Sequence, residues 1–331
     1  MAESAFDVHG VTVHATLDDR ERVLGPVLAR LGHAELRAEP SLSLRVRVHD
    51  EPCVLSEEQA RDPRFFFGLS QGYVTAQGYA LSDAGSTAVI DCAQRSVTVA
   101  MYRDPVSGAC PATSPGLSHS ALCLALREWE LFELHAACVV DRDLAALIVG
   151  DSGSGKTSTT LAMITAGASF LADDRVLLRR GSGAVQVCAY PRDFHVTDQT
   201  MSAHQALRDR VSSGEGTAFD HKRLLDGYAV FSQRFVRSWG ARKVLVLPSI
   251  RGESGTLVRR VSASEGFGHL LESSALALVD GVRKRSENLA VLRDLANESS
   301  AFEVQLGREW LENPAQSAML LWAQLREMSR S

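Results

Sequence analysis

An eight-residue run, Gly150-Asp151-Ser152-Gly153-Ser154-Gly155-Lys156-Thr157, constrains the fold of this chain more than any other feature. It fits the pattern G-x-x-x-x-G-K-[ST], in which glycines let the backbone turn tightly and aim its N–H groups at phosphate oxygens. Lys156 supplies a positive charge for the β- and γ-phosphates, and Thr157 supplies a hydroxyl for Mg²⁺. The run, with Ser158 after it, therefore predicts a binding site for a nucleoside triphosphate such as ATP, together with magnesium.

The residues on both sides of the loop have the patterns that the motif needs. Residues 144–149 form a continuous apolar run, which is typical of a strand buried on both faces. Residues 157–164 predict a helix, and Gly167 is placed to end it. The positive end of that helix dipole lies beneath the bound anion. Strand, loop and helix thus follow in the expected order.

The composition excludes several classes of protein. The 331 residues are enough for two domains, and the net charge of −5 argues against bulk electrostatic binding to nucleic acid or to anionic lipid. No apolar stretch approaches the roughly 20 residues of a membrane span, and the first residues do not resemble a signal peptide. The six cysteines form no C-x-x-C pair. We therefore expect reduced thiols in a cytoplasmic protein that binds neither nucleic acid nor membrane.

The first third of the chain is expected to be rich in strands. Residues 42–49 alternate apolar and polar, residues 97–102 do so less strictly, and strands are also expected at 65–67 and 73–75. One early helix is expected at 18–32. The turn-rich stretch 105–116 is the best candidate for a boundary, so we expect a β-rich N-terminal domain at 1–115 and the nucleotide-binding domain at 116–331.

The second domain is expected to be mixed α/β. We expect a strand-turn-strand unit entering the loop, a strand closed by Pro248, and a polar segment at 198–240 that is mobile or faces the substrate. The expected helices are 118–133, 264–278, 281–296 and 313–328, and the expected strands are 135–140, 169–172, 176–178, 185–187 and 243–247.

A pair of acids supplies what the loop lacks. Phosphoryl transfer needs a second acidic group to place Mg²⁺ and, for a hydroxyl acceptor, a base. Asp173 and Asp174 follow the expected strand 169–172, which we expect beside the loop strand. Adjacent carboxylates repel each other, so the pKa of one can rise, as suits a base. The residues alone leave open which of the two is the base. His135, at the start of the strand 135–140, is a further candidate.

Three segments together resemble the catalytic core of HPr kinase/phosphorylase. They are residues 134–140, the loop 150–157 and the segment Leu171-Ala172-Asp173-Asp174. That family has a His-Gly-x-Leu-Val strand, a Gly-Asp-Ser-Gly-x-Gly-Lys-Ser loop and a Val-Ala-Asp-Asp segment at similar spacings. The same order is similar to that of phosphoenolpyruvate carboxykinase. The resemblance implies an α/β fold with an HPr kinase/phosphoenolpyruvate carboxykinase-like P-loop core, here behind a β-rich (α+β) N-terminal domain.

The chain also resembles the lasso-peptide kinases, relatives of that family that phosphorylate the terminal serine of a precursor peptide. The likeness includes an N-terminal region before the core and the segment Tyr190-Pro191-Arg192 after it. It implies an ATP- and Mg²⁺-dependent serine kinase acting on a peptide or protein. Asp173 and Asp174 would serve as base and, with Thr157, as metal ligands. His135 would tune the base or contact the γ-phosphate, and Arg192 would neutralise charge; His195 is a weaker candidate. Large family relatives form rings, so a homo-oligomer is compatible with the resemblance.

Two departures narrow what the resemblance implies. Ser158 stands where the family has an acidic residue, and the downstream Arg-Gly-Leu-Gly-Ile-Ile signature is absent, with only residues 250–254 as a poor substitute. The phosphorylase reaction and HPr as a substrate are therefore not expected. A kinase of a small molecule would need the same core. A nucleotide-dependent regulatory protein without transfer would need only the loop, so both alternatives stay open.

Overall fold

The computed structural model describes residues 2–21, 24–35, 40–61, 63–67, 70–108, 114–204, 207, 211–212 and 222–330. Their fold is mixed α/β with several sheets. The described residues fall into two compact units. Unit 1 contains residues up to 132 together with 275–286, and unit 2 contains the remaining described residues from 133 onward.

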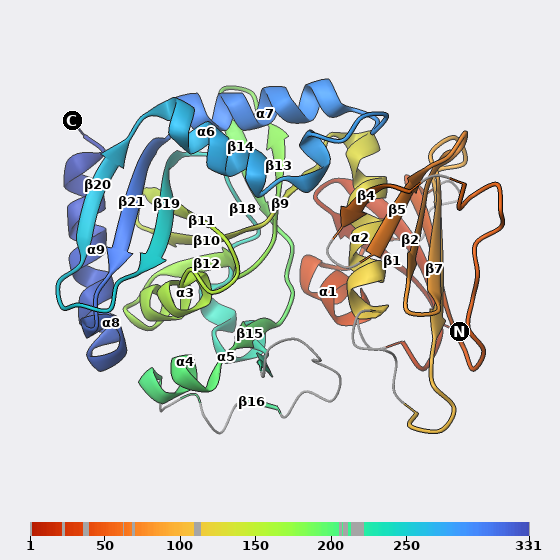
Figure 1. Cartoon of the computed structure of the whole chain (residues 1–331), viewed down its shortest axis with the longest axis horizontal. Coiled ribbons are helices and arrows are strands. Elements are labelled where there is room, and N and C mark those ends of the chain that lie inside the picture. The colour runs from red at the N-terminus through yellow and green to blue at the C-terminus, as the bar shows by residue number, and fades with distance from the viewer. Residues whose placement is uncertain are drawn as a thin grey trace. The chain divides into compact units, whose positions relative to one another are not determined.

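Unit 1 is built on a mixed sheet that, in the described residues, has eight strands in the order β1-β2-β3-β8-β7-β6-β5-β4. β3 pairs in parallel with β2 and β8, and the other neighbours are antiparallel. Two helices, α1 (Leu24–Leu31) and α2 (Ser114–Leu126), pack against β1 and against β6–β8 (Figure 1). The strands are β1 (Ala2–Val8), β2 (Val11–Leu17), β3 (Leu42–His49), β4 (Pro63–Phe67), β5 (Ser70–Val74), β6 (Gly78–Asp83), β7 (Ser86–Asp91) and β8 (Ser96–Tyr102).

Unit 2 contains three sheets within the described residues, in the orders β12-β10-β11-β19-β21-β20, β18-β14-β13-β9 and β15-β17-β16. The first consists of β10 (Ala136–Asp141), β11 (Leu144–Val149), β12 (Ser169–Ala172), β19 (Arg242–Ile250), β20 (Leu257–Val261) and β21 (Ser300–Leu306). The others consist of β9 (Phe132–Leu134), β13 (Val176–Arg180), β14 (Val185–Ala189), β15 (Phe194–Val196), β16 (Val211–Ser212), β17 (Arg223–Leu225) and β18 (Ser238–Trp239). The helices are α3 (Lys156–Thr165), α4 (Asp198–Ala203), α5 (Gly227–Val230), α6 (Ala263–Glu272), α7 (Arg285–Glu298), α8 (Glu309–Glu312) and α9 (Pro314–Met328), with 3-10 turns at 127–129, 232–234 and 275–277.

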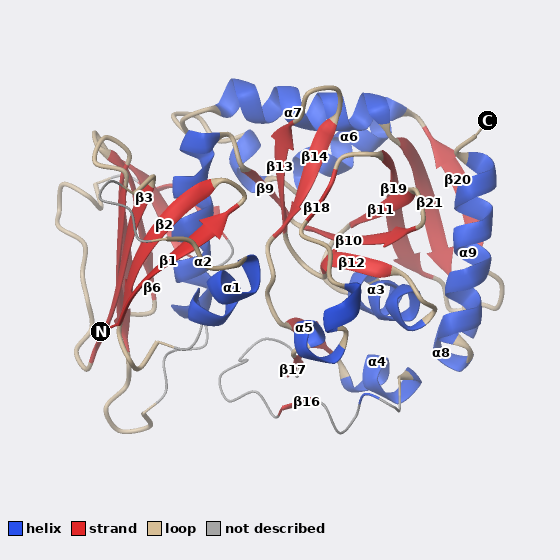
Figure 2. Ribbon diagram, turned by 180° about the vertical axis from the view of Figure 1, so that it is seen from behind, coloured by secondary structure: helices blue, strands red, loops and turns tan. Residues whose placement is uncertain are grey.

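The strand that enters the loop is buried on both faces, as its apolar run predicts. In β11, Leu144, Ala146 and Ile148 join the hydrophobic core that also contains α3 and α9, while the residues between them face the other side. On that other face α6 packs closely, since a Cβ at Gly266 would lie 3.3 Å from Leu245 of β19. α3 and α9 contact each other over the sheet (Figure 2). Helices on both faces therefore fix the strand end that carries the loop.

Most expected elements are present, and several expected helices differ in their limits. The early helix begins at Leu24 and not at residue 18, because β2 runs to Leu17 and the Glu21 carboxylate accepts hydrogen bonds from the N–H groups of Leu24 and Gly25. The helix expected at 118–133 spans 114–126 and a 3-10 turn. It ends where Glu130 adopts a left-handed φ of 56°, and β9 follows.

Two expectations about the central sheet are wrong in detail. β12 pairs with β10 and not with the loop strand β11, so one strand separates Asp173 and Asp174 from that strand. β19 does not stop at Pro248 but runs to Ile250. Pairing with β11 ends at Val246 whereas pairing with β21 continues, so Pro248 lies where one side of the strand has no partner strand.

Helix α2 and the segment 275–286 change the expected division of the chain. α2 packs on the sheet of unit 1, although the boundary expected at residues 115 and 116 would separate them. Residues 275–286, which run from shortly after α6 into the first two residues of α7, also belong to unit 1, where Gly281 lies against Val74. The helices expected at 264–278 and 281–296 therefore differ in their limits: α6 ends at Glu272 and α7 begins at Arg285.

Two further expectations concern membranes and thiols. No helix in the described ranges is long and apolar enough to cross a membrane. Cys53, Cys92, Cys138 and Cys188 are free cysteines, Cys123 is buried, and Cys110 lies outside the described residues. Within the polar segment 198–240, residues 205–206, 208–210 and 213–221 lie outside them too; the described parts contain α4, α5, β16, β17 and β18.

Candidate phosphoryl-transfer site

The glycine loop joins β11 to α3 with the backbone that phosphate binding needs. Gly153 and Gly155 have φ values of +85° and +100°, which side chains rarely permit. A Cβ at Gly155 would also lie 2.7 Å from Leu306 Cδ1, closer than real Cβ atoms come. The loop conformation therefore requires glycine at both positions. At Gly153 the reason is the backbone angle, and at Gly155 it is the backbone angle together with the lack of space for a side chain.

Lys156 folds back over the loop. Its Nζ donates hydrogen bonds to Gly150 O at 2.5 Å and to Asp151 O at 3.0 Å, and the residue is buried. Burial lowers its pKa, while the charges of Asp174 and Asp173 act to raise it. Nearby, Ser154 Oγ is buried and has no hydrogen-bond partner among the described residues. An ammonium held by carbonyls beside an unsatisfied hydroxyl suits a loop built for an anion.

Asp173 lies directly against the loop. Its Oδ2 accepts a hydrogen bond from Thr157 Oγ1 at 3.0 Å, and the residue is only 3% exposed. Its Oδ1 is buried with no hydrogen-bond partner in the described part of the chain. Burial, and then the neighbouring Asp174 charge, raise the pKa of Asp173 to about 7. A buried oxygen without a partner costs stability unless something else binds there, and a hydroxyl and a carboxylate side by side are ligands that Mg²⁺ accepts.

Asp174 has different neighbours. Its Oδ1 lies 3.3 Å from His135 Nδ1, and its Oδ2 accepts a hydrogen bond from Arg192 Nη1 at 3.1 Å. Burial acts to raise the pKa of Asp174, but the charges of His135 and Arg192, and after them Arg175, outweigh it and hold that pKa well below its usual range. The side chain is about one-third exposed, at 32%. Asp174 is thus an ionised carboxylate open to solvent beside a buried one.

His135 is the single residue between β9 and β10 in the chain, and it lies at the edge of the site. Its backbone N–H donates to Ser273 O at 2.9 Å, which fixes the chain at this point. Burial lowers the pKa of its imidazole, although the Asp174 charge opposes the shift. The imidazole is therefore neutral at neutral pH, and its charge lowers the Asp174 pKa only at the acidic pH where Asp174 would itself take up a proton.

The structure brings together almost all of the expected site residues, and Ser158 has a separate partner. Ser158 Oγ lies 2.8 Å from Thr200 Oγ1 on α4, and Thr200 Oγ1 lies 3.0 Å from Thr197 Oγ1. Thr197 is also the N-cap of α4, accepting from the Thr200 N–H. These hydroxyls tie α4 to the first turn of α3.

Sequence reasoning missed three residues of this site. Arg175 Nε lies 3.4 Å from Glu133 Oε1, and both side chains are nearly buried beside His135 and Asp174. Lys222 Nζ donates a hydrogen bond to Ser152 Oγ of the loop at 3.3 Å. Arg175 has a sequence signal, since it directly follows Asp174. Lys222 has none, because only the fold brings it to the loop.

No three His, Cys, Asp or Glu side chains in the described ranges are grouped to hold a metal ion by themselves. Mg²⁺, however, usually keeps several waters and binds through one or two protein oxygens together with substrate phosphates. Thr157 and Asp173 fit that mode of binding, and the unsatisfied Asp173 Oδ1 is the observation that supports it.

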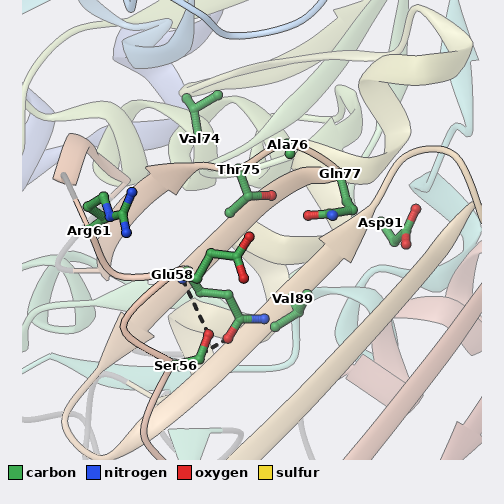
Figure 3. Close-up of a pocket in the computed structure, with 10 residues that line it drawn as sticks. Ser56, Glu58, Arg61, Val74, Thr75, Ala76, Gln77, Val89 and Asp91 are labelled. Carbon is green, nitrogen blue, oxygen red and sulfur yellow. Dashed lines mark hydrogen bonds between the residues drawn. The ribbon is translucent and has the colours of Figure 1, made fainter.

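A cavity of about 800 Å³ lies elsewhere, in unit 1 (Figure 3). Residues of the 56–61 loop face the ends of β5 and β7 across it, with Glu58 and Arg61 on one side and Asp91 on the other. Ser56 and Gln59 hold the loop through two hydrogen bonds between backbone N–H groups and side-chain oxygens. The lining is polar and carries charges of both signs.

Comparison with known proteins adds a weak likeness to solved structures. No protein-family model matches the chain, and no curated protein matches it. Among solved structures it is similar to an Hpr(Ser) kinase/phosphatase from Coxiella burnetii, at 13% identity and a TM-score of 0.32, over 59% of this chain and 97% of that chain. A likeness of that size carries no argument about function, which depends on the geometry above.

Proposed function

We propose that the protein is an ATP- and Mg²⁺-dependent phosphotransferase whose acceptor is a hydroxyl group. One observation carries the proposal: the phosphate loop and a pair of carboxylates are joined directly, by the Thr157–Asp173 hydrogen bond. A loop alone would fit any nucleotide-binding protein, whereas a loop joined to paired acids has the groups that phosphoryl transfer needs.

The loop side of the site would bind the nucleotide. The backbone N–H groups of residues 150–157 and the Lys156 ammonium hold the phosphates, and Thr157 and Asp173 hold Mg²⁺. The ion supplies charge neutralisation on the phosphate oxygens when it is bound. Lys156 exchanges its two carbonyl partners for phosphate oxygens, which are stronger acceptors because they are charged.

Asp174 is the residue we assign to the acceptor hydroxyl. Asp173 is buried against Thr157, while Asp174 is partly open to solvent and already ionised. Its carboxylate orients the hydroxyl and takes its proton as the bond to phosphorus forms. His135 and Arg192 hold that carboxylate in place, and Arg192 also offsets negative charge on the transferring group. Transition states of this reaction are loose, so positioning matters more than base strength.

The acceptor we propose is a serine of a peptide or protein, with a ribosomal precursor of the lasso-peptide type as the first candidate. The motif resemblance supports it, and so does the cavity of unit 1, because a polar lining with charges of both signs suits a peptide segment. Unit 1 would then recognise the acceptor while unit 2 performs the transfer. A small-molecule acceptor would use the same core without needing that cavity.

The test is mass spectrometry of the protein with Mg-ATP and a serine-terminated precursor peptide from the same locus. We expect the peptide to gain one phosphate, about 80 Da, with the wild type and with the control Lys284→Ala, whose ammonium pairs with Glu130 in unit 1. Lys156→Ala should give no gain. Phosphate transfer only to small hydroxyl compounds would replace the peptide with a small-molecule acceptor. ATP binding without transfer to any acceptor would contradict the proposal and favour a regulatory nucleotide-binding protein.

A further inference from the structure

A second lysine reaches the phosphate loop from another part of the chain. Lys222 Nζ donates to Ser152 Oγ at 3.3 Å, while Lys156 Nζ donates to the carbonyls of Gly150 and Asp151. The two ammonium groups therefore contact three consecutive residues of one loop. The motif accounts for one of them only.

The backbone at Lys222 is fixed independently of the loop. Lys222 directly precedes β17, which pairs with β15 in a register that sets Arg223 opposite Val196. Val196 directly precedes Thr197, the N-cap of α4, whose hydroxyl is linked through Thr200 to Ser158 on α3. Because this route leads back to the first turn of the loop helix, the strand end keeps a fixed place relative to the loop.

The charge of Lys222 acts on the side chains of Lys156 and Asp173. The pKa of Lys156 is lowered mainly by burial, with the Lys222 charge contributing, while Lys222 acts against the raised pKa of Asp173. Two positive groups beside one loop repel each other, and an anion between them relieves that repulsion. Arg192 and Arg175 add positive charge around Asp174. The arrangement suits a ligand with several negative charges.

We propose that Lys222 is a second phosphate-binding residue, whose ammonium contacts oxygens of the γ-phosphate of the bound triphosphate. This rests on the proposed function. The γ-phosphate is the group that must lie between the loop and the paired acids, and Lys222 acts electrostatically on both Lys156 and Asp173. Lys222 exchanges the neutral Ser152 hydroxyl for charged oxygens, which are the stronger acceptors.

In the transfer step, a bond forms between the acceptor oxygen and the γ-phosphorus while the bond from that phosphorus to the β–γ bridging oxygen breaks. The acceptor proton goes to Asp174, and the electron pair of the broken bond stays on the β-phosphate. Lys222 neutralises charge on the moving phosphoryl group throughout. Phosphotransferases commonly use an added cation in this way, and here the chain itself supplies it.

The experiment compares the affinities of ATP and ADP by calorimetric titration with Mg²⁺, without an acceptor. For Lys222→Ala we expect ATP to bind roughly 10- to 100-fold more weakly, as for the loss of a hydrogen bond to a charged group. ADP, which lacks the γ-phosphate, should change less than about threefold. Lys222→Arg keeps the charge and should recover part of the ATP affinity.

Arg223→Ala is the matched control. It removes a positive charge from the next residue, whose guanidinium lies 3.0 Å from Asp198 and not at the loop. We expect wild-type affinity for both nucleotides. Unchanged ATP affinity in Lys222→Ala would overturn the inference, and so would equal loss of ATP and ADP affinity. A melting temperature within a few degrees of the wild type shows that the variants are folded.

The same titrations separate this inference from the proposed function. Both proposals would be contradicted if the wild-type protein binds no ATP. They would also be contradicted if the Lys156→Ala variant binds ATP as tightly as the wild type does. ATP binding that depends on Lys156 but not on Lys222 would overturn only the role of Lys222, and the phosphotransferase proposal would stand.

Discussion

Both units contain a cluster of charged side chains around a buried ionisable residue, and the two clusters differ in how completely their polar groups are satisfied. In unit 1, Arg127 is 1% exposed, donates two hydrogen bonds to Arg283 O and stacks over the Phe132 ring at 5.1 Å. Arg283 in turn donates two hydrogen bonds to the Glu128 carboxylate, and its backbone N–H donates to Tyr79 Oη.

The site in unit 2 shows the opposite condition. Asp173 Oδ1 and Ser154 Oγ are buried without partners among the described residues, and two carboxylates are adjacent in the chain. A cluster whose groups all have partners stabilises a fold, whereas unsatisfied buried groups cost stability and persist where a ligand completes them. The difference favours a structural role for the cluster of unit 1 and agrees with the ligand-binding role that we propose for the site in unit 2.

The strongest test of this contrast is Lys156→Ala. We expect nucleotide-dependent transfer to fall by at least about 1000-fold, because the ammonium that neutralises the phosphates is lost. The melting temperature of the nucleotide-free protein should change by less than about 3 °C, since the hydrogen bonds of the Lys156 ammonium in the described residues go to two carbonyls of the loop itself. Transfer rates and thermal unfolding measure the two effects. A large loss of stability would mean that Lys156 is structural.

The two carboxylates should separate binding from turnover. Asp174→Asn should lower kcat by about 100-fold or more with little change in ATP affinity, because we assign Asp174 to the acceptor hydroxyl and not to the nucleotide. Asp173→Asn should weaken Mg-dependent ATP binding. It should also raise the melting temperature of the nucleotide-free protein by about 2–4 °C, because it removes a buried carboxylate beside a second one. Kinetics, titration and thermal unfolding of both variants measure these effects. Equal changes in kcat and in ATP affinity for Asp173→Asn and Asp174→Asn would contradict the division of roles.

Substitution in the unit 1 cluster should lower the stability of the protein without changing its ATP affinity. Arg127→Ala leaves the Arg283 carbonyl without its donors and opens a space over Phe132, so we expect the free energy of unfolding to fall by about 2–3 kcal/mol. At a temperature where the variant is fully folded, ATP affinity should equal that of the wild type. Denaturant unfolding and titration measure the two. Loss of ATP affinity in the folded variant would show that this cluster also serves the nucleotide site.

The smallest effect is expected at the cavity. Asp91→Lys reverses one of its charges and should raise KM for the acceptor peptide by about 5- to 10-fold without changing KM for ATP. The control Glu57→Lys makes the same charge change on an exposed neighbour of Glu58 outside the lining. Steady-state kinetics with each substrate varied in turn give both constants. Equal KM for the peptide in wild type and Asp91→Lys would remove the cavity from acceptor recognition.

Local patterns were enough to predict the parts of the site that are close in sequence. The apolar run, the glycine loop and the helix start are all contiguous, and the acids directly follow a short strand, so β11, α3, Asp173 and Asp174 were predictable. The pairing of β12 with β10 was not, because register depends on tertiary contacts. Lys222 and the Arg175–Glu133 pair depend on contacts between segments far apart in the chain, which no local pattern encodes.

The inserted segment 275–286 has a consequence for how the chain is made. Arg127 obtains its carbonyl partner from Arg283, 156 residues later, so unit 1 cannot be completed when its own strands leave the ribosome. At about 5–20 residues per second, that partner follows roughly 8 to 30 s behind. During this interval most of unit 2 is synthesised, and Arg127, which is buried in the finished fold, has no Arg283 carbonyl to which it can donate. We expect unit 1 to be sensitive to protease in nascent chains that end before residue 275. Chains that include residues 275–286 should have a protease-resistant unit 1.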